Sequence, residues 1–326
     1  MKKTLIALAA IAAVGAASAQ VTVYGKADVG IVDSGSGSKV VDGGYEGSRI
    51  GVKGEADIGG GMKASFQLEK AISLVDGTAG NWHGTGSFFD RVGMVAVSGS
   101  FGTVSAGLQW SPYDNAFWTA DAMEYNGFSA SNKVMCSYAF SAHCDNGNTG
   151  WGNAKNSIQY ASPDINGFQG FIMTAPNVAH SGGITGYTGY GVNYSKGPVN
   201  INFAGESYGS VTSMIIGGNY NLGAATVYAG YETADTGTAV INGGTKGGKD
   251  TGFSFGVKVP MGANYVTVGY ASEETAPVTG AKATASGWGA QFIAPMGKNA
   301  VAYAGYRTVT AAATVNTTGA GLRYNF

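Results

Sequence analysis

The sequence predicts an all-β fold, a transmembrane antiparallel β-barrel of about sixteen strands with one long loop folded inward. Three observations lead to this prediction: segments in which apolar and polar residues alternate, connections that are alternately short and long, and few charged residues. Charged residues make up 12% of the chain, whereas a soluble domain carries about 25%. Such a chain exposes unusually little charge to its surroundings.

Residues 1–19 have the three parts of a secretory signal peptide: a basic MKK start, an apolar middle and the small residues ASA. We expect cleavage after Ala19 and export of the chain from Gln20 onward. The net charge of −1 then becomes −3, because Lys2 and Lys3 are lost. With this charge balance, nucleic acid is not an expected partner.

Strands are predicted where every second residue is apolar, as in residues 21–31, 49–57 and 63–69. Val21 and Val23, for example, share the apolar face of the first segment. A period of two is the pattern of a strand with one apolar side. After the signal peptide no apolar run approaches the roughly 18 residues that a transmembrane helix requires. A membrane would therefore be crossed by strands.

Short turns alternate with long polar connections along the chain. Residues 58–61 and 260–264 are examples of the short turns, and residues 34–45, 235–250 and 273–284 of the long connections. This layout is typical of transmembrane barrels, which have an even number of strands. We count about sixteen strands, the last of which would pair with the first and close the ring. A barrel of this size is too wide for side chains to fill, so its interior would hold water.

The connection at residues 111–153 interrupts the pattern, because about forty residues pass without alternation. Loops of this length are usually functional. This one combines the aromatic residues Tyr113, Phe117 and Trp118 with the acids Asp114, Asp121 and Glu124. An aromatic and acidic loop suggests a constriction inside the barrel. The aromatic residues are interpreted mainly as packing that holds the loop, with stacking against a sugar as the alternative.

The only two cysteines, Cys136 and Cys144, lie in this loop with seven residues between them. In an exported chain this spacing fits a disulfide, with two unpaired thiols as the alternative. A zinc site would need more ligands than these two residues and His143 supply. We therefore predict neither a metal nor a cofactor.

No arrangement of serine, histidine and acid points to catalysis. All three histidines, His83, His143 and His180, fall in predicted loops. A hydrolase barrel would need a serine and a histidine on neighbouring strands, so the chain is not expected to be an enzyme.

Residues 48–64, SRIGVKGEADIGGGMKA, resemble the signature of the Gram-negative general porins of the β-proteobacterial and neisserial type. Further matches are the sequences VAVSGSFG at 95–102, NSIQYASP at 156–163 and GLRYNF at 321–326, so the resemblance covers essentially the whole mature chain. The resemblance implies a bacterial outer-membrane location and a homotrimer. It also implies that the third extracellular loop, residues 111–153, folds into the barrel and narrows it.

The resemblance further implies a basic cluster on the wall opposite the loop acids, to which Arg49 and Arg91 belong. Lys53 shares the polar face of Arg49. Asn153 stands where the family has a third arginine, with Lys155 two residues later on the same face. Arginine facing lipid costs about 2–4 kcal/mol at the bilayer centre, which favours a position inside the barrel. The missing arginine leaves the sign of the ion preference open.

Together these features predict a general diffusion porin, surrounded by outer-membrane lipid, through which ions and small hydrophilic solutes pass. Basic wall and acidic loop would set up a field across the constriction. The alternatives are a substrate-selective porin for a sugar or an organic anion, and a non-conducting barrel that anchors or adheres.

We predict that Cys136 and Cys144 form a disulfide within the loop. Peptide mass mapping of the unreduced protein should recover the two cysteines in one linked product. Recovery of both as free thiols would contradict the prediction.

Overall fold

The computed structural model describes residues 20–80, 88–137, 152–179, 185–209, 211–235, 237 and 248–326. Within them the chain forms seventeen strands and two helices: β1 Gln20–Asp33, β2 Lys39–Asp42, β3 Arg49–Gly59, β4 Met62–Ala71, β5 Val92–Gly99, β6 Gly102–Trp110, α2 Pro112–Ala120, α3 Ala130–Ser137, β7 Asn153–Ala161, β8 Phe168–Ala179, β9 Thr185–Lys196, β10 Val199–Tyr208, β11 Val211–Asn221, β12 Thr226–Asp235, β13 Gly248–Met261, β14 Asn264–Pro277, β15 Ala283–Met296, β16 Ala300–Thr310 and β17 Thr314–Asn325.

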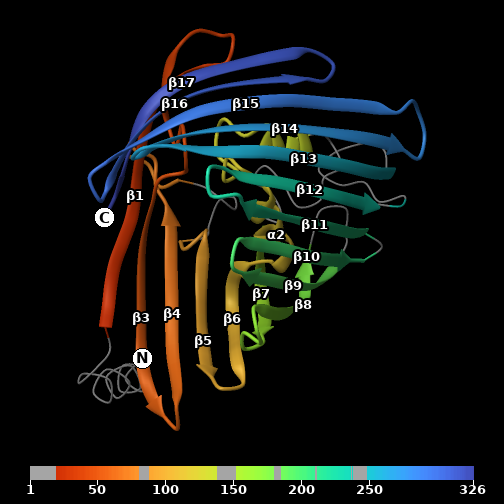
Figure 1. Cartoon of the computed structure of the whole chain (residues 1–326). Coiled ribbons are helices and arrows are strands. Elements are labelled where there is room, and N and C mark those ends of the chain that lie inside the picture. The colour runs from red at the N-terminus through yellow and green to blue at the C-terminus, as the bar shows by residue number, and fades with distance from the viewer. Residues whose placement is uncertain are drawn as a thin grey trace.

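Sixteen of these strands form a closed antiparallel ring, seen in Figure 1, which confirms the predicted barrel. Each ring strand pairs with its neighbours in sequence, and β1 pairs with both β3 and β17. Lys26 lies opposite Arg49 on one side and Asn325 on the other, and the amide of Gly25 donates to the carbonyl of Phe326 at 2.9 Å. The short β2 pairs only with the segment of β1 from Val29 to Val32. Closure leaves no ring strand with an unpaired edge.

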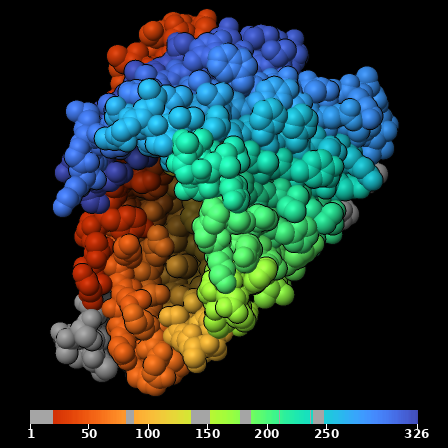
Figure 2. Space-filling model, viewed as in Figure 1, coloured from red at the N-terminus to blue at the C-terminus, as the bar shows by residue number. Residues whose placement is uncertain are grey.

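The outer face of the ring is apolar and the inner face is mixed. In β11 the side chains of Met214 and Ile216 are 48% and 52% exposed, whereas those of Val211, Ser213 and Ile215 are buried. Exposed apolar residues recur in this way around the barrel, an arrangement suited to lipid. Figure 2 shows the interior hollow between the N-terminal strands, red to orange, and the green strands of the middle of the chain.

No helix in the part of the chain that the structure describes is long and apolar enough to cross a membrane.

Several boundaries differ from those expected from the sequence. β6 ends at Trp110 and β7 begins at Asn153, and the segment between them contains α2 and α3. The side-chain oxygen of Ser111 accepts a hydrogen bond from the amide of Asp114 at 3.0 Å, and Pro112 follows. Both residues are common at the start of a helix, but the composition of the segment favours a loop. The predicted loop at 273–284 is shorter, because β14 continues to Pro277. The signal peptide, residues 1–19, lies outside the described residues.

The loop lies against a row of glycines on the inner wall, which we call the glycine row. Its members are Gly217, Gly230, Gly256, Gly269, Gly289, Gly305 and Gly319, on β11 to β17. A Cβ added at Gly217 would lie 2.5 Å from the Cβ of Ala120, and one at Gly305 would lie 2.4 Å from Cγ of Phe128. One at Gly289 would meet the carbonyl of Phe128 at 2.1 Å. The loop reaches the wall this closely because these strands carry no side chain there.

We predict that Gly305→Val displaces the loop and leaves the barrel intact. Valine suits a strand, but its side chain would overlap the ring of Phe128, and overpacking of this kind costs about 1–3 kcal/mol. Limited proteolysis should therefore cut the loop sooner than in the parent. Gly170→Val is the matched control, since a Cβ there meets its nearest atom at 3.9 Å. Equal cleavage of the Gly305 variant and the parent would show that the loop is not seated on this glycine.

Candidate functional site

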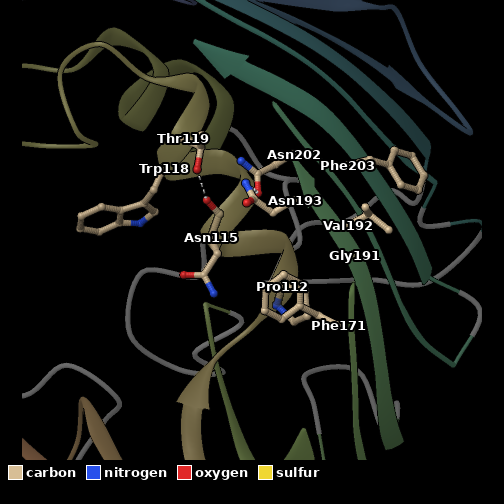
Figure 3. Close-up of a pocket in the computed structure, with 10 residues that line it drawn as sticks. All are labelled: Pro112, Asn115, Trp118, Thr119, Phe171, Gly191, Val192, Asn193, Asn202 and Phe203. Carbon is tan, nitrogen blue, oxygen red and sulfur yellow. Dashed lines mark hydrogen bonds between the residues drawn. The ribbon is translucent and has the colours of Figure 1, made fainter. Parts of the chain in front are cut away.

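The described part of the loop from Ser111 to Ser137 is fixed to the inner wall. The helix α2 packs on β9 to β12, and α3 on β13 to β16; Figure 3 shows α2 beside the green strands. The hydroxyl of Tyr113 donates to Glu232 at 3.0 Å, and Nδ2 of Asn219 donates to the carbonyl of Thr119 at 3.2 Å. Tyr113 and Phe117 are buried. The loop thus occupies one side of the interior.

The segment between α2 and α3 is held by the wall and by the first loop, which connects β1 to β3. Arg307 of β16 donates to the carbonyl of Gly127, and Nδ2 of Asn126 donates to Gln291 at 2.7 Å. The amide of Gly127 donates to the carbonyl of Tyr45 at 3.2 Å. Tyr45, which is buried, belongs to the turn between β2 and β3. The first and third loops are therefore joined inside the barrel.

Arg49 and Arg91 come together on one carboxylate of the uncovered wall. Nε of Arg91 lies 2.5 Å from Oε1 of Glu69, and Nε of Arg49 lies 3.6 Å from the same oxygen. Arg91 is 4% exposed. Its guanidinium also lies 5.6 Å from the ring centroid of Trp110, a cation–π contact. The structure thus brings Arg49 and Arg91 together on Glu69.

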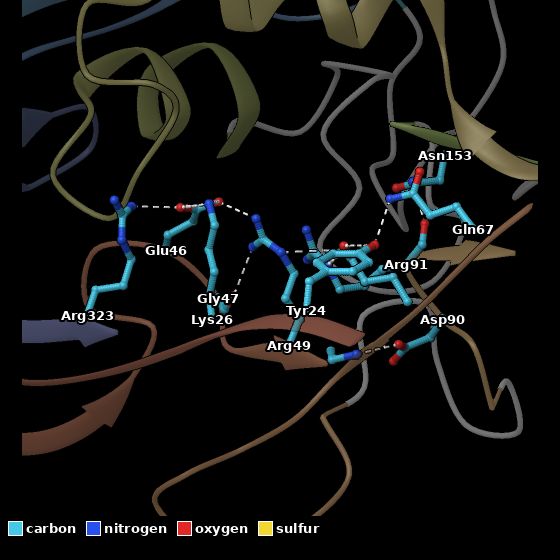
Figure 4. A network of polar contacts seen from close by, with 12 residues as sticks. Tyr24, Lys26, Glu46, Gly47, Arg49, Gln67, Asp90, Arg91, Asn153 and Arg323 are labelled. Atoms are coloured by element: carbon cyan, nitrogen blue, oxygen red, sulfur yellow. Dashed lines mark hydrogen bonds and ion pairs between the residues drawn. The ribbon is translucent and has the colours of Figure 1, made fainter. Parts of the chain in front are cut away.

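A second carboxylate, Glu46 of the first loop, gathers three cations. It pairs with Lys26, Arg49 and Arg323, and Nη1 of Arg323 lies 2.8 Å away (Figure 4). Burial alone would raise the pKa of Glu46, but Arg49 and Lys26 outweigh it and lower the pKa to about 2. Glu46 is therefore charged at neutral pH. Through Arg49 the two carboxylates and four cations form one network, which we call the charge network.

The other predicted basic residues lie around the charge network. Lys53 is exposed, and its Nζ lies 5.3 Å from the ring centroid of Tyr24, whose hydroxyl donates to Glu69 at 3.0 Å. Asn153 donates from Nδ2 to the carbonyl of Arg91 at 2.7 Å. Lys155, half-buried in β7, follows two residues later. Asn153 thus supports the backbone of Arg91, where a third arginine was expected from the resemblance.

The three predicted loop acids have different environments. Burial raises the pKa of Asp114 to about 7, and Arg91 partly offsets this rise. Asp121 accepts from the amides of Met123 and Tyr125 and from Ser129, so it holds the turn after α2. Its pKa is raised by burial, which those hydrogen bonds oppose. Of the three loop acids, Asp114 is the one whose pKa is lowered by the charge of Arg91.

Glu124 faces a different cation. One of its oxygens lies 3.5 Å from Nζ of Lys258 on β13, and its side chain is half-exposed. Its backbone has a φ of 54°, in the left-handed region. An acid wall formed by all three loop acids opposite Arg49 and Arg91 stays a prediction.

The loop aromatic residues pack on one another. The rings of Trp118 and Tyr125 stack at 6.1 Å, and Phe117 meets Tyr125 edge-on at 4.9 Å. Trp118 is half-buried, whereas Tyr113 and Phe117 are closed to solvent. Only Trp118 of the three predicted residues keeps surface for a solute.

Comparison with known proteins identifies the family. The family model for Gram-negative porins matches residues 4–325. The chain belongs to this family. It is 32% identical to the major outer membrane protein P.IB of Neisseria gonorrhoeae over 66% of this chain, and this match covers 64% of the relative, a little under two thirds of its length. It is also 32% identical to outer membrane porin protein 32 of Delftia acidovorans, over 69% of this chain and 67% of the relative.

Solved porins share the fold of the chain. The anion-selective porin from Comamonas acidovorans superposes with a TM-score of 0.77 at 21% identity, covering 95% of this chain and all of that one. A trimer form of OmpT from Vibrio cholerae gives 0.70 at 14% identity, with 95% and 100% covered. At these identities the likeness concerns the fold.

Sequence reasoning overlooked three features of this porin: Glu46, the glycine row and Arg323. Glu46 sits at the end of a polar loop without periodicity, so nothing in the sequence indicated that it faces inward. The glycine row had a usable signal, because its members fall on the inner face of successive strands. Arg323 had one too, since it alternates with the outward Leu322 and Tyr324. The predicted disulfide lies outside the described residues: the side chain of Cys136 is not described, nor is Cys144.

We predict that Glu46→Gln destabilises this porin at neutral pH by about 1–3 kcal/mol, because it leaves partly buried cations without their counter-charge. The pKa of Glu46 is lowered on folding from 4.5 to about 2. Its contribution is therefore complete above the unfolded value and is lost as pH falls through the folded one. The difference between parent and variant should shrink as pH falls from 4.5 towards 2, measured by thermal unfolding in detergent.

The control is Glu55→Gln, which breaks the exposed pair with Lys63. Exposed pairs contribute about 0–1 kcal/mol, so little change is expected. Equal effects of the two substitutions at pH 7 would argue against a special role for Glu46.

Proposed function

We propose that this porin forms a water-filled channel for passive diffusion of ions and small hydrophilic solutes across the outer membrane. One observation carries the proposal. The loop helices pack on β8 to β16, whereas the charge network belongs to β1, β3, β4 and β17 with the first loop and the segment before β5. A passage between these two sides would be lined by fixed charges on one wall and the loop on the other.

The charge network supports a preference for anions. Lys26, Arg49, Arg91 and Arg323 share Glu46 and Glu69, so the cations outnumber the carboxylates. Asp114 would offset only part of this excess, because burial raises its pKa to about 7 and so leaves it partly neutral at that pH. A positive excess in a narrow pore attracts anions and repels cations. The Comamonas neighbour is named as anion-selective, which accords with this proposal.

Location and assembly form part of the proposal. The apolar outer face supports insertion in outer-membrane lipid, after removal of a signal peptide ending at Ala19. A homotrimer is supported by the trimer form of OmpT. The chain would act as a channel and not as an enzyme.

Single-channel recording of the purified protein in a planar bilayer tests the function. Discrete, lasting current steps are expected, with a reversal potential that favours anions in a salt gradient. A folded protein that gives no steps would support the anchoring or adhesive alternative. Saturable binding of a sugar or an organic anion by the protein would instead support the substrate-selective alternative.

We predict that replacing Arg49 and Arg91 with glutamine shifts the reversal potential towards cations, since the local positive excess is removed. The control replaces the exposed Lys249 and Lys282 with glutamine, which changes the net charge equally away from the network. Circular dichroism checks that both proteins fold. An unchanged reversal potential in the arginine variant would exclude these residues from the conducting path.

We also predict that shortening the loop between Phe117 and Cys136 raises conductance and admits larger sugars. The pairing of the ring strands does not involve this segment, so the barrel should still fold. Liposome swelling with sugars of increasing size measures the cutoff. A folded, shortened protein with the cutoff and conductance of the parent would place the loop outside the passage.

A further inference from the structure

A cavity of about 310 Å³ lies between α2 and the inner wall, at the side of the interior away from the charge network. Asn115 and Thr119 line it from the helix, and Asn193 and Asn202 from β9 and β10 (Figure 3). Its size is at the lower end of the range for small-molecule sites, about 300–1,000 Å³. It could hold one solute of monosaccharide size.

The lining of this cavity carries no charged side chain among the described residues. Asn193 donates from Nδ2 to Oδ1 of Asn202 at 2.9 Å and to Oδ1 of Asn200 at 2.8 Å, which fixes these amides in place. Such prepared groups select a solute by its hydrogen bonds and not by its charge.

Two side chains that line the cavity, one on the helix and one on the wall, have hydrogen-bonding groups without a partner among the described residues. The side-chain amide of Asn115 is exposed and makes no hydrogen bond to a described residue. The bonds of Asn193 use its Nδ2 and leave its Oδ1 as an acceptor. A free amide and a free carbonyl oxygen offer both donors and acceptors, which hydroxyl groups require.

Two aromatic residues, Trp118 and Phe171, also line the cavity. In Figure 3 the ring of Phe171 lies beside Pro112, whereas the ring of Trp118 points away from Asn193 and Asn202. One part of the lining can therefore bury C–H groups while another bonds hydroxyls. Neutral sugars and cyclic polyols present this combination, whereas an inorganic anion presents only charge.

The helix α2, which supplies four of the ten lining residues, is held close to the wall. The carbonyl of Thr119 accepts from Asn219 at 3.2 Å, and a Cβ added at Gly191 would lie 3.3 Å from Cβ of Pro112. The cavity therefore exists before any solute arrives, so little ordering cost accompanies binding.

We propose that this cavity is a weak binding subsite for neutral, hexose-sized sugars or polyols on the loop side of the passage. The inference rests on the proposed channel function, because the solute must reach the interior. The channel then has two sides of different chemistry: a charged wall for ions and an amide and aromatic pocket for neutral solutes.

Equilibrium binding of glucose to the folded protein tests the subsite without relying on conductance. The protein is kept in a detergent without a sugar head group, and saturation-transfer NMR is used to titrate glucose. Saturable binding is expected, with gluconate, a charged analogue of similar size, binding more weakly. Equal binding of gluconate would overturn the neutral preference, and the absence of saturable glucose binding would overturn the subsite.

Asn115→Ala and Asn193→Ala should each weaken glucose binding about five- to tenfold, the value of one or two hydrogen bonds. Asn115 lies on an exposed helix position, so its variant should fold even if the strand variant does not. Asn299→Ala, in the exposed turn before β16, is the control and should bind as the parent does. Unchanged binding in the Asn115 variant would overturn the assignment of this cavity.

Conductance separates this inference from the function on which it rests. A parent protein that conducts ions but shows no saturable glucose binding would refute the subsite alone. A parent that binds glucose but passes no current would refute the channel and leave the binding site in place.

Discussion

The close contact between loop and wall governs the rest of the interior. A loop can approach the backbone of the strands this closely only where they carry no side chains, and the glycine row provides such a surface. Glycine in a strand interior weakens the strand and loses more entropy on folding than other residues. That cost is offset by burial of Phe117, Met123 and Phe128 between the loop and the wall. The position of the loop then fixes which wall remains open.

The open wall is organised by a different constraint, the cost of burying charge. Arg91 is nearly closed to solvent, and Glu46 and Glu69 are little exposed. Each would be strongly unfavourable without a partner. Because Lys26, Arg49, Arg91 and Arg323 share two carboxylates, every charge of the network has a partner although its cations outnumber its carboxylates. Paired charges of this kind still act on ions in the adjacent water, because their fields cancel only in part.

The sequence carried the barrel but only part of the site. Alternation in segments such as β1 and the rhythm of short and long connections are local signals, and they predicted the ring and the bounds of the long loop. The arginine cluster followed from the resemblance around Arg49. The partners Glu46 and Glu69 could not be assigned, because they depend on the register of β1, β3 and β4 and on the path of the first loop. Asp121 and Asp114 are both acids of one loop, yet only their three-dimensional neighbours show that one organises a turn and the other lies near Arg91.

Two adjacent residues of the first loop, Tyr45 and Glu46, have different roles. The carbonyl of Tyr45 accepts a hydrogen bond from the amide of Gly127 and so supports the long loop, while Glu46 pairs with three cations of the wall. The position of the long loop and the charge of the wall therefore both depend on the same short segment of the first loop. A backbone shift in this segment would move both together, so permeability and selectivity cannot be adjusted independently at that point of the chain.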